Sequence, residues 1–509
     1  MSRKAEAASG SASVLRGAMV NLVGTGARAA TPLVLIAMTR LYGPSLVGAY
    51  AIAIALLRIV ETMLSSGFRD AMVFYGGRYA HRDDDHSSSR LYEAFAHSTF
   101  WVTASSIALA SFVFLVPSVL EANFPQAGAV VAIRWIALAL PFVCLREMFL
   151  AGTRSLMVMR HTAFVNGVIG PLSLLGFTLL GALYRPSLDV LMGAVVLSQV
   201  ATTLWAARLF GRHFSPVRFA KAMFPPKIDR ELFGFAIPQN LNMTFTQFVS
   251  SVDVVMLGLF GVAAPQVAFY SIGAQITREL RTFRRSFSSV LSPLISRLHG
   301  EGRLSELETQ FVSTSRWTLM ATVPLALVLL CLIDDVLLVF HPTFSGDTTF
   351  VWLLTVNPLM AAAVGMAGNV LVMTGFSKWN LFNSLLSAGL NVGLNVALIP
   401  RFGLTGAAAA TMASGVFITI LQLVETRLLV GVGTSLRGLS RPLLAGLVGG
   451  AVAALGWAVL PAPGGVWIRI AITVVALASY AGALWAQGLS DEDRNALTRA
   501  FGPRRRRAP

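Results

Sequence analysis

Charged residues and cysteines are both scarce in this chain. Only 13% of its 509 residues are Asp, Glu, Lys or Arg, whereas soluble domains average about 25%. The two cysteines, Cys144 and Cys331, each lie within an apolar run, which excludes a disulfide framework and a cysteine-rich metal site. The sequence also has no Walker A loop, no HExxH pair and no Gly-x-Ser-x-Gly elbow. An ATP-driven pump or an evident hydrolase would therefore lack its motif.

Apolar residues are correspondingly abundant. They make up 55% of the chain, the mean hydropathy is +0.68, and long apolar runs occupy residues 317–333 and 443–460. A soluble core cannot hide this much apolar surface, so the surroundings must be a lipid bilayer. Long runs indicate helices, because a membrane barrel would alternate polar and apolar residues. We predict an all-α polytopic membrane protein with about fourteen transmembrane helices of roughly 20 residues each.

The net charge of +16 is explained by membrane topology. In a soluble protein such a charge would suggest a nucleic-acid partner, but Lys and Arg also collect in cytoplasmic loops of membrane proteins. With the N-terminus inside, the predicted cytoplasmic segments hold most of the basic residues, and the predicted outer loops hold only Arg185 and Arg401. We therefore expect a multi-pass protein of the cytoplasmic (inner) membrane, with both termini cytoplasmic and no nucleic-acid partner.

The two halves of the sequence resemble each other. Asn166 and Asn383 are 217 positions apart (383 − 166), as are Trp135 and Trp352 (352 − 135), and Pro141 and Pro358 (358 − 141). Tyr50 and Tyr270 are 220 apart, as are Arg58 and Arg278. These near-constant offsets favour a duplicated six-helix unit, hence two pseudo-symmetric lobes plus two C-terminal helices. The expected segments are 1–14 (cytoplasmic tail), 15–210 (N-lobe, helices 1–6), 211–230 (basic cytoplasmic linker), 231–430 (C-lobe, helices 7–12), 431–490 (helices 13 and 14) and 491–509 (basic cytoplasmic tail).

Ionisable and polar side chains inside the predicted spans mark a candidate site. Each intramembrane charge costs roughly 2.5–3.5 kcal/mol on insertion scales, so such residues face a bundle interior or an aqueous cavity. Helical spacing places them on one face of the first, second, seventh and eighth spans. We expect these faces to line a cleft between the lobes. The candidate substrate-binding residues are Asn21, Arg28, Arg58, Gln239, Asn242, Gln275, Arg278 and Arg281.

The excess of arginine in this set favours an anionic ligand, because guanidinium groups bind phosphate in bidentate fashion. The alternative is local pairing that only holds helices together, Arg58 with Glu61 or Arg278 with Asp253. Nearer the end of the fourth span, Arg146 and Glu147 could be satisfied by snorkelling. Asp253 and Glu61 are also candidates for a coupling ion, Na⁺ or H⁺; we expect no other cofactor and no metal centre.

Several short stretches resemble polysaccharide (O-antigen type) flippases. They are RLYGP at 40–44, GFRDA at 67–71, DVVMLG at 253–258, LNVGLN at 390–395 and LIPRFGLTGAA at 398–408. In order and spacing this series is similar to the family over residues 15–430. The resemblance implies the multidrug/oligosaccharidyl-lipid/polysaccharide exporter superfamily, whose members have two six-helix lobes and work by alternating access.

The resemblance also implies a function. The flippase branch moves polyprenyl-pyrophosphate-linked glycans across the cytoplasmic membrane, so we expect a non-enzymatic transporter for surface polysaccharide biosynthesis, such as lipopolysaccharide. Its partners would be a lipid-linked glycan, membrane lipids and a polysaccharide polymerase. The sequence leaves two rival functions open. One is a drug/cation antiporter of the same superfamily, against which the arginines argue. The other is a membrane polysaccharide polymerase or ligase, which would usually carry a large outer loop.

Overall fold

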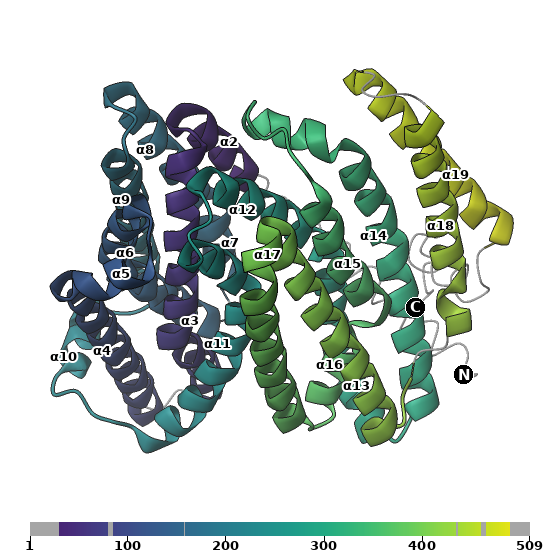
Figure 1. Cartoon of the computed structure of the whole chain (residues 1–509). Coiled ribbons are helices and arrows are strands. Elements are labelled where there is room, and N and C mark those ends of the chain that lie inside the picture. Colours follow the sequence, from purple (N-terminus) through teal and green to yellow (C-terminus); the bar gives the residue numbers. More distant parts are fainter. Residues whose placement is uncertain (1–29, 80–84, 157, 434–435, 460–464, 489–509) are drawn as a thin grey trace, which may run out of the picture.

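A computed structural model describes residues 30–79, 85–156, 158–433, 436–459 and 465–488. Throughout these ranges the regular elements are helices (Figure 1). In the first half they are α2 (Ala30–Tyr42), α3 (Pro44–Tyr79), α4 (Asp85–Leu115), α5 (Pro117–Asn123), α6 (Ala127–Ser155), α7 (Met159–Phe164), the π-helix η2 (Val165–Ile169), α8 (Gly170–Tyr184), α9 (Leu188–Phe210) and α10 (Pro216–Met223). In the second half they are α11 (Arg230–Leu259), α12 (Ala264–Glu279), α13 (Thr282–Gly300), α14 (Leu304–Phe340), α15 (Thr349–Val364), α16 (Ala367–Met373), α17 (Ser377–Glu425), the π-helix η3 (Thr426–Val430), α18 (Leu436–Val459) and α19 (Val466–Gln487).

Many of these helices are long and apolar enough to cross a membrane. Nine of the described helices qualify, and the bent pair α15 and α16 raises the number to ten. Large apolar side chains such as Leu183, Leu447 and Trp485 are exposed, as expected where lipid replaces water. The predicted polytopic all-α fold is confirmed.

The difference between ten spans and the fourteen predicted has identifiable causes. The 54-residue stretch Ser377–Val430 counts once, although the chain breaks inside it at Gly403, whose φ of 55° and ψ of −125° are not helical. A positive φ of this kind favours glycine. The helices α2, α11 and α12–α13 are not among the qualifying ones. α2 is short within the described residues, whereas α11 and α12–α13 carry the polar faces that the sequence predicts for a cavity.

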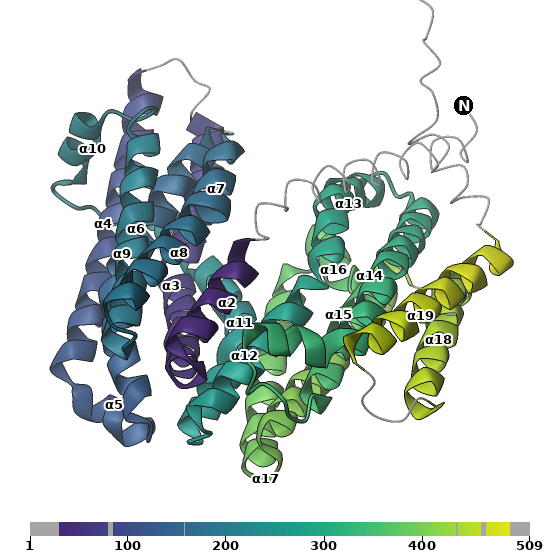
Figure 2. The same cartoon turned by 90° about the horizontal axis from the view of Figure 1, so that it is seen from above.

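The helices form two lobes, which meet at α2 of the first lobe and at α11 and α12 of the second, and α18 and α19 lie outermost on the second lobe (Figure 2). The first residues of equivalent helices in the two lobes are separated by nearly the same offsets as the matched single residues. α3 begins at Pro44 and α12 at Ala264, a difference of 220 (264 − 44); α7 begins at Met159 and α17 at Ser377, a difference of 218 (377 − 159). The duplicated unit read from the sequence is thus visible in the helix boundaries.

The lobes meet in a close backbone contact. A Cβ atom placed on Gly48 of α3 would lie 1.8 Å from the carbonyl oxygen of Ala264 in α12, and one on Gly67 would lie 1.9 Å from that of Ala236 in α11. Asn240 accepts hydrogen bonds from Ser66 Oγ and from the Gly67 backbone N–H, at 3.0 and 2.5 Å. Glycine is required at these two positions because any side chain would force the lobes apart.

Candidate functional site

Three cavities meet at the boundary between the lobes. The N-lobe cavity has a volume of about 320 Å³ and is lined by residues of α2, α3, α6, η2, α8 and α9 together with α11 and α12. The central cavity, about 580 Å³, lies between α2 and α3 on one side and α11 to α13 on the other. The C-lobe cavity, about 250 Å³, lies among α11, α12, α13, α15 and α17. Arg278 lines all three, so it stands at their junction.

The structure brings four of the sequence-predicted residues together. Arg58 and Gln275 line both the N-lobe and the central cavity, and Arg281 lines both the central and the C-lobe cavity. Arg58 comes from α3 of one lobe and Arg278 from the equivalent α12 of the other. The two pseudo-symmetric arginines therefore face one cavity, as their matched sequence positions suggested.

Arg58 and Arg278 keep most of their hydrogen-bonding capacity. To the described residues Arg278 donates one hydrogen bond, from Nη1 to the Ser250 carbonyl oxygen at 3.2 Å. Within the described part of the chain, Arg58 forms neither a hydrogen bond nor an ion pair with another side chain. A guanidinium group carries five N–H donors. These two side chains can therefore hold an anionic ligand without breaking an existing ion pair.

The other predicted substrate-binding residues lie elsewhere or cannot be placed. Gln239 is not at the cavity as we expected: its Nε2 donates to Asp70 Oδ2 at 2.8 Å, next to the lobe contact. Asn242 is also absent from the lining of the three cavities. Asn21 and Arg28 lie outside the described residues. Helical spacing gave the correct face for Arg58 and Arg278, but it could not show where along α11 the cavity ends.

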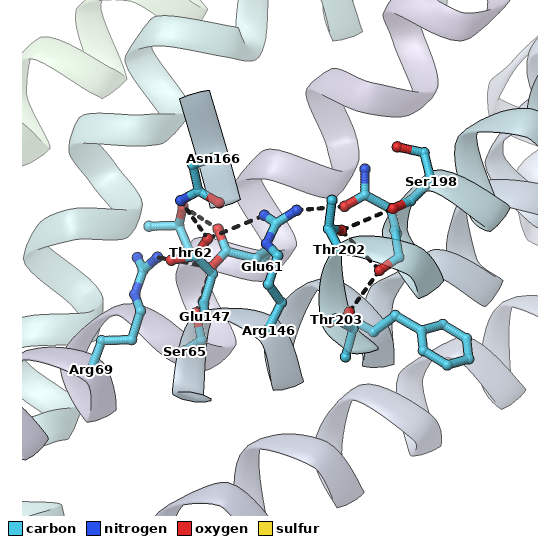
Figure 3. Close-up of polar contacts among 12 residues, drawn as sticks. Glu61, Thr62, Ser65, Arg69, Arg146, Glu147, Asn166, Ser198, Thr202 and Thr203 are labelled. Atoms are coloured by element: carbon cyan, nitrogen blue, oxygen red, sulfur yellow. Dashed lines mark hydrogen bonds and ion pairs between the residues drawn. The ribbon is translucent and has the colours of Figure 1, made fainter. Parts of the chain in front are cut away.

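A buried ion network (Figure 3) includes Glu61, Arg146 and Asn166, which line the N-lobe cavity. Arg69 contacts Glu61 at 3.2 Å and Glu147 at 3.1 Å, and Arg146 contacts the other oxygen of Glu147 at 3.1 Å. Ser65 donates to Glu61 at 2.6 Å, and Asn166 donates to Glu147 at 3.3 Å. Two arginines thus balance two glutamates, and this part of the site carries no net charge.

This network excludes two of the alternatives that the sequence left open. Arg146 and Glu147 do not snorkel to the membrane surface, because Glu147 is buried and Arg146 also donates to Gln199 at 2.6 Å. Glu61 pairs with Arg69, not with Arg58. The sequence signal was present, since Arg69 follows Glu61 by eight residues on the same helix face, but it could not identify Glu147 as the second partner.

Asp253 is the centre of a second buried network, in the C-lobe. Its carboxylate accepts hydrogen bonds from Tyr270 Oη at 3.0 Å, from Asn395 Nδ2 at 3.1 Å and from Thr411 Oγ1. Asn391 receives a hydrogen bond from Asn395 at 2.9 Å. Among the described residues no salt bridge joins Asp253 to an arginine. The alternative pairing of Arg278 with Asp253 is therefore not formed among these residues, and neutral donors surround this carboxylate.

Sequence reasoning missed several residues of this region. Asn391, Asn395 and Thr411 come from α17, far from Asp253 in the chain. The spacing of four residues between Asn391 and Asn395 was the available signal, because it places both amides on one helix face. Arg284, which lines the C-lobe cavity beside Arg278 and Arg281, was also missed.

One more polar contact joins the lobes, at the end where α2 and α14 terminate. Arg40 Nε donates to the Val339 carbonyl at 3.0 Å, and Nη2 donates to the carbonyls of Leu338 and Val339 at 2.8 and 2.9 Å. The last carbonyls of a helix lack intrahelical partners and carry partial negative charge. Arg40 therefore caps α14 from the opposite lobe.

The family described as "Polysaccharide biosynthesis protein" matches residues 14–299, which is more than half of the chain, and the MatE family matches residues 238–397. A probable low-salt glycan biosynthesis flippase, Agl15 of Haloferax volcanii, is 22% identical over 277 residues, which is 54% of this chain and 55% of that protein. The chain spans about half the length of the curated relatives it matches.

Two solved structures share the fold. The lipid II flippase MurJ in an inward closed conformation has a TM-score of 0.68 at 12% identity, covering 92% of this chain and 99% of MurJ. An inward-facing multidrug resistance MATE family transporter of the MOP superfamily has a TM-score of 0.65 at 14% identity, covering 81% of this chain and 98% of that protein. At these identities the likeness concerns the fold alone.

Proposed function

Because this chain belongs to the polysaccharide biosynthesis protein family, a flippase branch of the MOP superfamily, we propose that it flips polyprenyl-pyrophosphate-linked oligosaccharides. The cargo moves from the inner to the outer leaflet of the cytoplasmic membrane for the assembly of surface polysaccharide. A membrane polysaccharide polymerase would act on the exported units.

The observation that carries this proposal is the arginine pair across the central cavity. Arg58 and Arg278 line it from opposite lobes, and neither forms an ion pair with a carboxylate of the described residues. In the proposed complex they hold the pyrophosphate in bidentate fashion. Gln275 and neighbouring hydroxyl groups contact the first sugars, and the polyprenyl chain stays in the lipid. The same arginines disfavour a cationic drug as the cargo, because like charges repel in a low-dielectric cavity.

Alternating access would use the two ends of the lobe interface in turn. Under the predicted topology, the end of α2 that carries Arg40 faces outward, and both termini are cytoplasmic. The Arg40 contacts with α14 then hold the outer side closed while the cargo enters from the cytoplasmic side. Rocking of the lobes about the α3–α11 contact would open the outer side and release the cargo.

A coupling cation, Na⁺ or H⁺, is proposed to bind at Asp253. The oxygen atoms that suit a hard cation gather there: the carboxylate of Asp253 and the side-chain oxygens of Asn391, Asn395 and Thr411. Asn395 Oδ1 is buried and accepts no hydrogen bond from the described part of the chain, so it is available as a cation ligand. Glu61, the other candidate, is engaged by Arg69 and Ser65, which makes it the weaker site.

Loss of the protein from its host tests this function. Lipid extracts of a depleted strain are expected to hold complete glycan units on polyprenyl pyrophosphate, trapped in the inner leaflet. Units that reach the outer leaflet but stay unpolymerised would point to an enzyme instead. Unchanged lipid-linked glycans would refute the proposal and favour the antiporter.

Arg40→Gln is expected to raise the population of molecules whose lobes are separated at the end where α2 and α14 terminate. The change removes the charge that caps α14, and charge-assisted hydrogen bonds of this kind shift a two-state equilibrium by about tenfold. Distances between spin labels at Leu183 and Ser345, both near that end, would report the separated population. Arg185→Gln, an exposed arginine nearby, is the control. An unchanged distance distribution in Arg40→Gln would contradict the proposed role.

A further inference from the structure

The C-lobe cavity is electrostatically unbalanced. Arg278, Arg281 and Arg284 line it, and Asp253 is the one acidic residue among its described lining residues. The N-lobe network pairs two arginines with two glutamates, whereas here three guanidinium groups face one carboxylate. That carboxylate already accepts three neutral hydrogen bonds. Uncompensated charge in a low-dielectric cavity is costly, which makes an anionic occupant favourable.

Unused polar atoms point to the chemistry of that occupant. The buried Nε atoms of Arg281 and Arg284 have no hydrogen-bond partner among the residues that the structure describes, and neither does the buried Oδ1 of Asn357. Asn357 is itself more than nine-tenths buried, and its Nδ2 already donates to the Thr411 carbonyl at 2.7 Å. The cavity therefore offers donors for an anion together with an acceptor for a hydroxyl group.

An acidic sugar matches these features, because it carries both an anionic group and hydroxyl groups. Ser387 and further hydroxyl-bearing residues also line the cavity, as expected of a surface that exchanges hydrogen bonds with a glycan. The cavity shares Ser250, Arg278 and Arg281 with the central cavity. A ligand whose pyrophosphate lies between Arg58 and Arg278 could therefore extend its glycan into the C-lobe.

We propose that the C-lobe cavity is an anion subsite for the glycan, so that the preferred cargo carries a negatively charged sugar. This inference rests on the proposed flippase function and adds the class of glycan. Arg284 is the specificity-determining residue, because it lines the C-lobe cavity but not the central one. The anion is a sugar carboxylate or a phosphate substituent, since both present oxygen atoms to guanidinium groups.

The test uses the full-length protein in proteoliposomes and three polyprenyl-pyrophosphate-linked glycans. The first glycan carries a glucuronate, and the second is the neutral methyl ester of the first. The third has only neutral sugars but carries an anionic phosphoglycerol substituent. Wild-type protein is expected to flip at least one acidic glycan about tenfold faster than the ester, the effect of one charge-assisted contact. A preference for glucuronate alone identifies a carboxylate as the ligand, and a preference for phosphoglycerol alone identifies a phosphate.

Arg284→Gln is expected to lower the acidic-to-ester rate ratio to near one. Arg284→Lys should retain part of the ratio, because the charge remains. Arg297→Gln, on the same helix α13 but exposed, should leave it unchanged. A ratio is insensitive to the amount of folded protein, so a poorly folding variant cannot imitate the effect.

Two results would overturn the inference. Equal wild-type rates for all three glycans would overturn the subsite and leave the flippase function standing. If Arg284→Gln slowed the flipping of acidic and neutral glycans equally, Arg284 would be assigned to the pyrophosphate that all three share. That result too would overturn the subsite and leave the flippase function standing. Failure of wild-type protein to flip any of the three would instead overturn the proposed function, and the subsite with it.

Discussion

Arg278→Ala and Arg58→Ala are each expected to abolish translocation of the lipid-linked glycan while leaving the protein folded. Each change removes one half of the guanidinium pair that faces the central cavity. Two charge-assisted hydrogen bonds lost to the pyrophosphate lower affinity by about 100-fold or more. Flipping into the outer leaflet of proteoliposomes measures the loss, and size-exclusion chromatography checks the fold.

The contacts around these arginines explain why the fold should survive. Arg278 gives up one hydrogen bond, to the Ser250 carbonyl at 3.2 Å, and Arg58 gives up none within the described residues. Arg401→Ala, an exposed arginine of α17, is the matched control. Normal export by both cavity variants would eliminate the arginine pair as the anchor of the cargo, and with it the main support for the flippase proposal.

Asp253→Asn is expected to uncouple transport from the cation gradient. Asparagine has nearly the same size as aspartate but carries no charge, so it neither attracts Na⁺ nor takes up a proton. Wild-type flipping rates should rise with an imposed Na⁺ or H⁺ gradient, and the variant should lose this dependence. Rates measured with each gradient in turn would also identify the coupling ion.

The network around Asp253 makes this substitution informative. Tyr270, Asn395 and Thr411 all donate to the carboxylate, and an amide can accept through its oxygen only. We therefore expect a lower melting temperature as well, since at least one buried donor loses its acceptor. Asp347→Asn, in the exposed connection between α14 and α15, serves as the control. Full gradient dependence in Asp253→Asn would remove Asp253 as the coupling site.

Some features of the site were accessible from sequence because they are periodic or repeated. Arg58 and Arg278 occupy equivalent positions of a duplicated unit, and the 220-residue offset between them recurs in the starts of α3 and α12. Two lobes placed side by side bring equivalent helix faces to one interface. The convergence of these two residues on one cavity followed from that symmetry.

Other features depended on contacts between helices that lie far apart in the chain. Gln239 lies on a polar stripe of α11 yet bonds to Asp70 at the lobe contact. Arg146 and Glu147 looked like residues near a helix end, but the crossing of α3 over α6 buries them against Arg69. Periodicity gives the face of a helix, and only the packing of neighbouring helices decides what that face meets.

The sequence by itself determined the bilayer surroundings, the all-helical fold, the repeat and the arginine-rich face, because composition and period are local properties of the chain. The tertiary structure alone decided which charges are neutralised. It paired Glu61 and Glu147 with Arg69 and Arg146, gave Asp253 neutral donors from α17, and left Arg281 and Arg284 without a carboxylate partner in the described part of the C-lobe. The physical reason is that these interactions act over short distances, since an ion pair or hydrogen bond forms only when two groups come within about 3–4 Å. The packing of helices sets that distance, and the spacing of residues along the sequence does not.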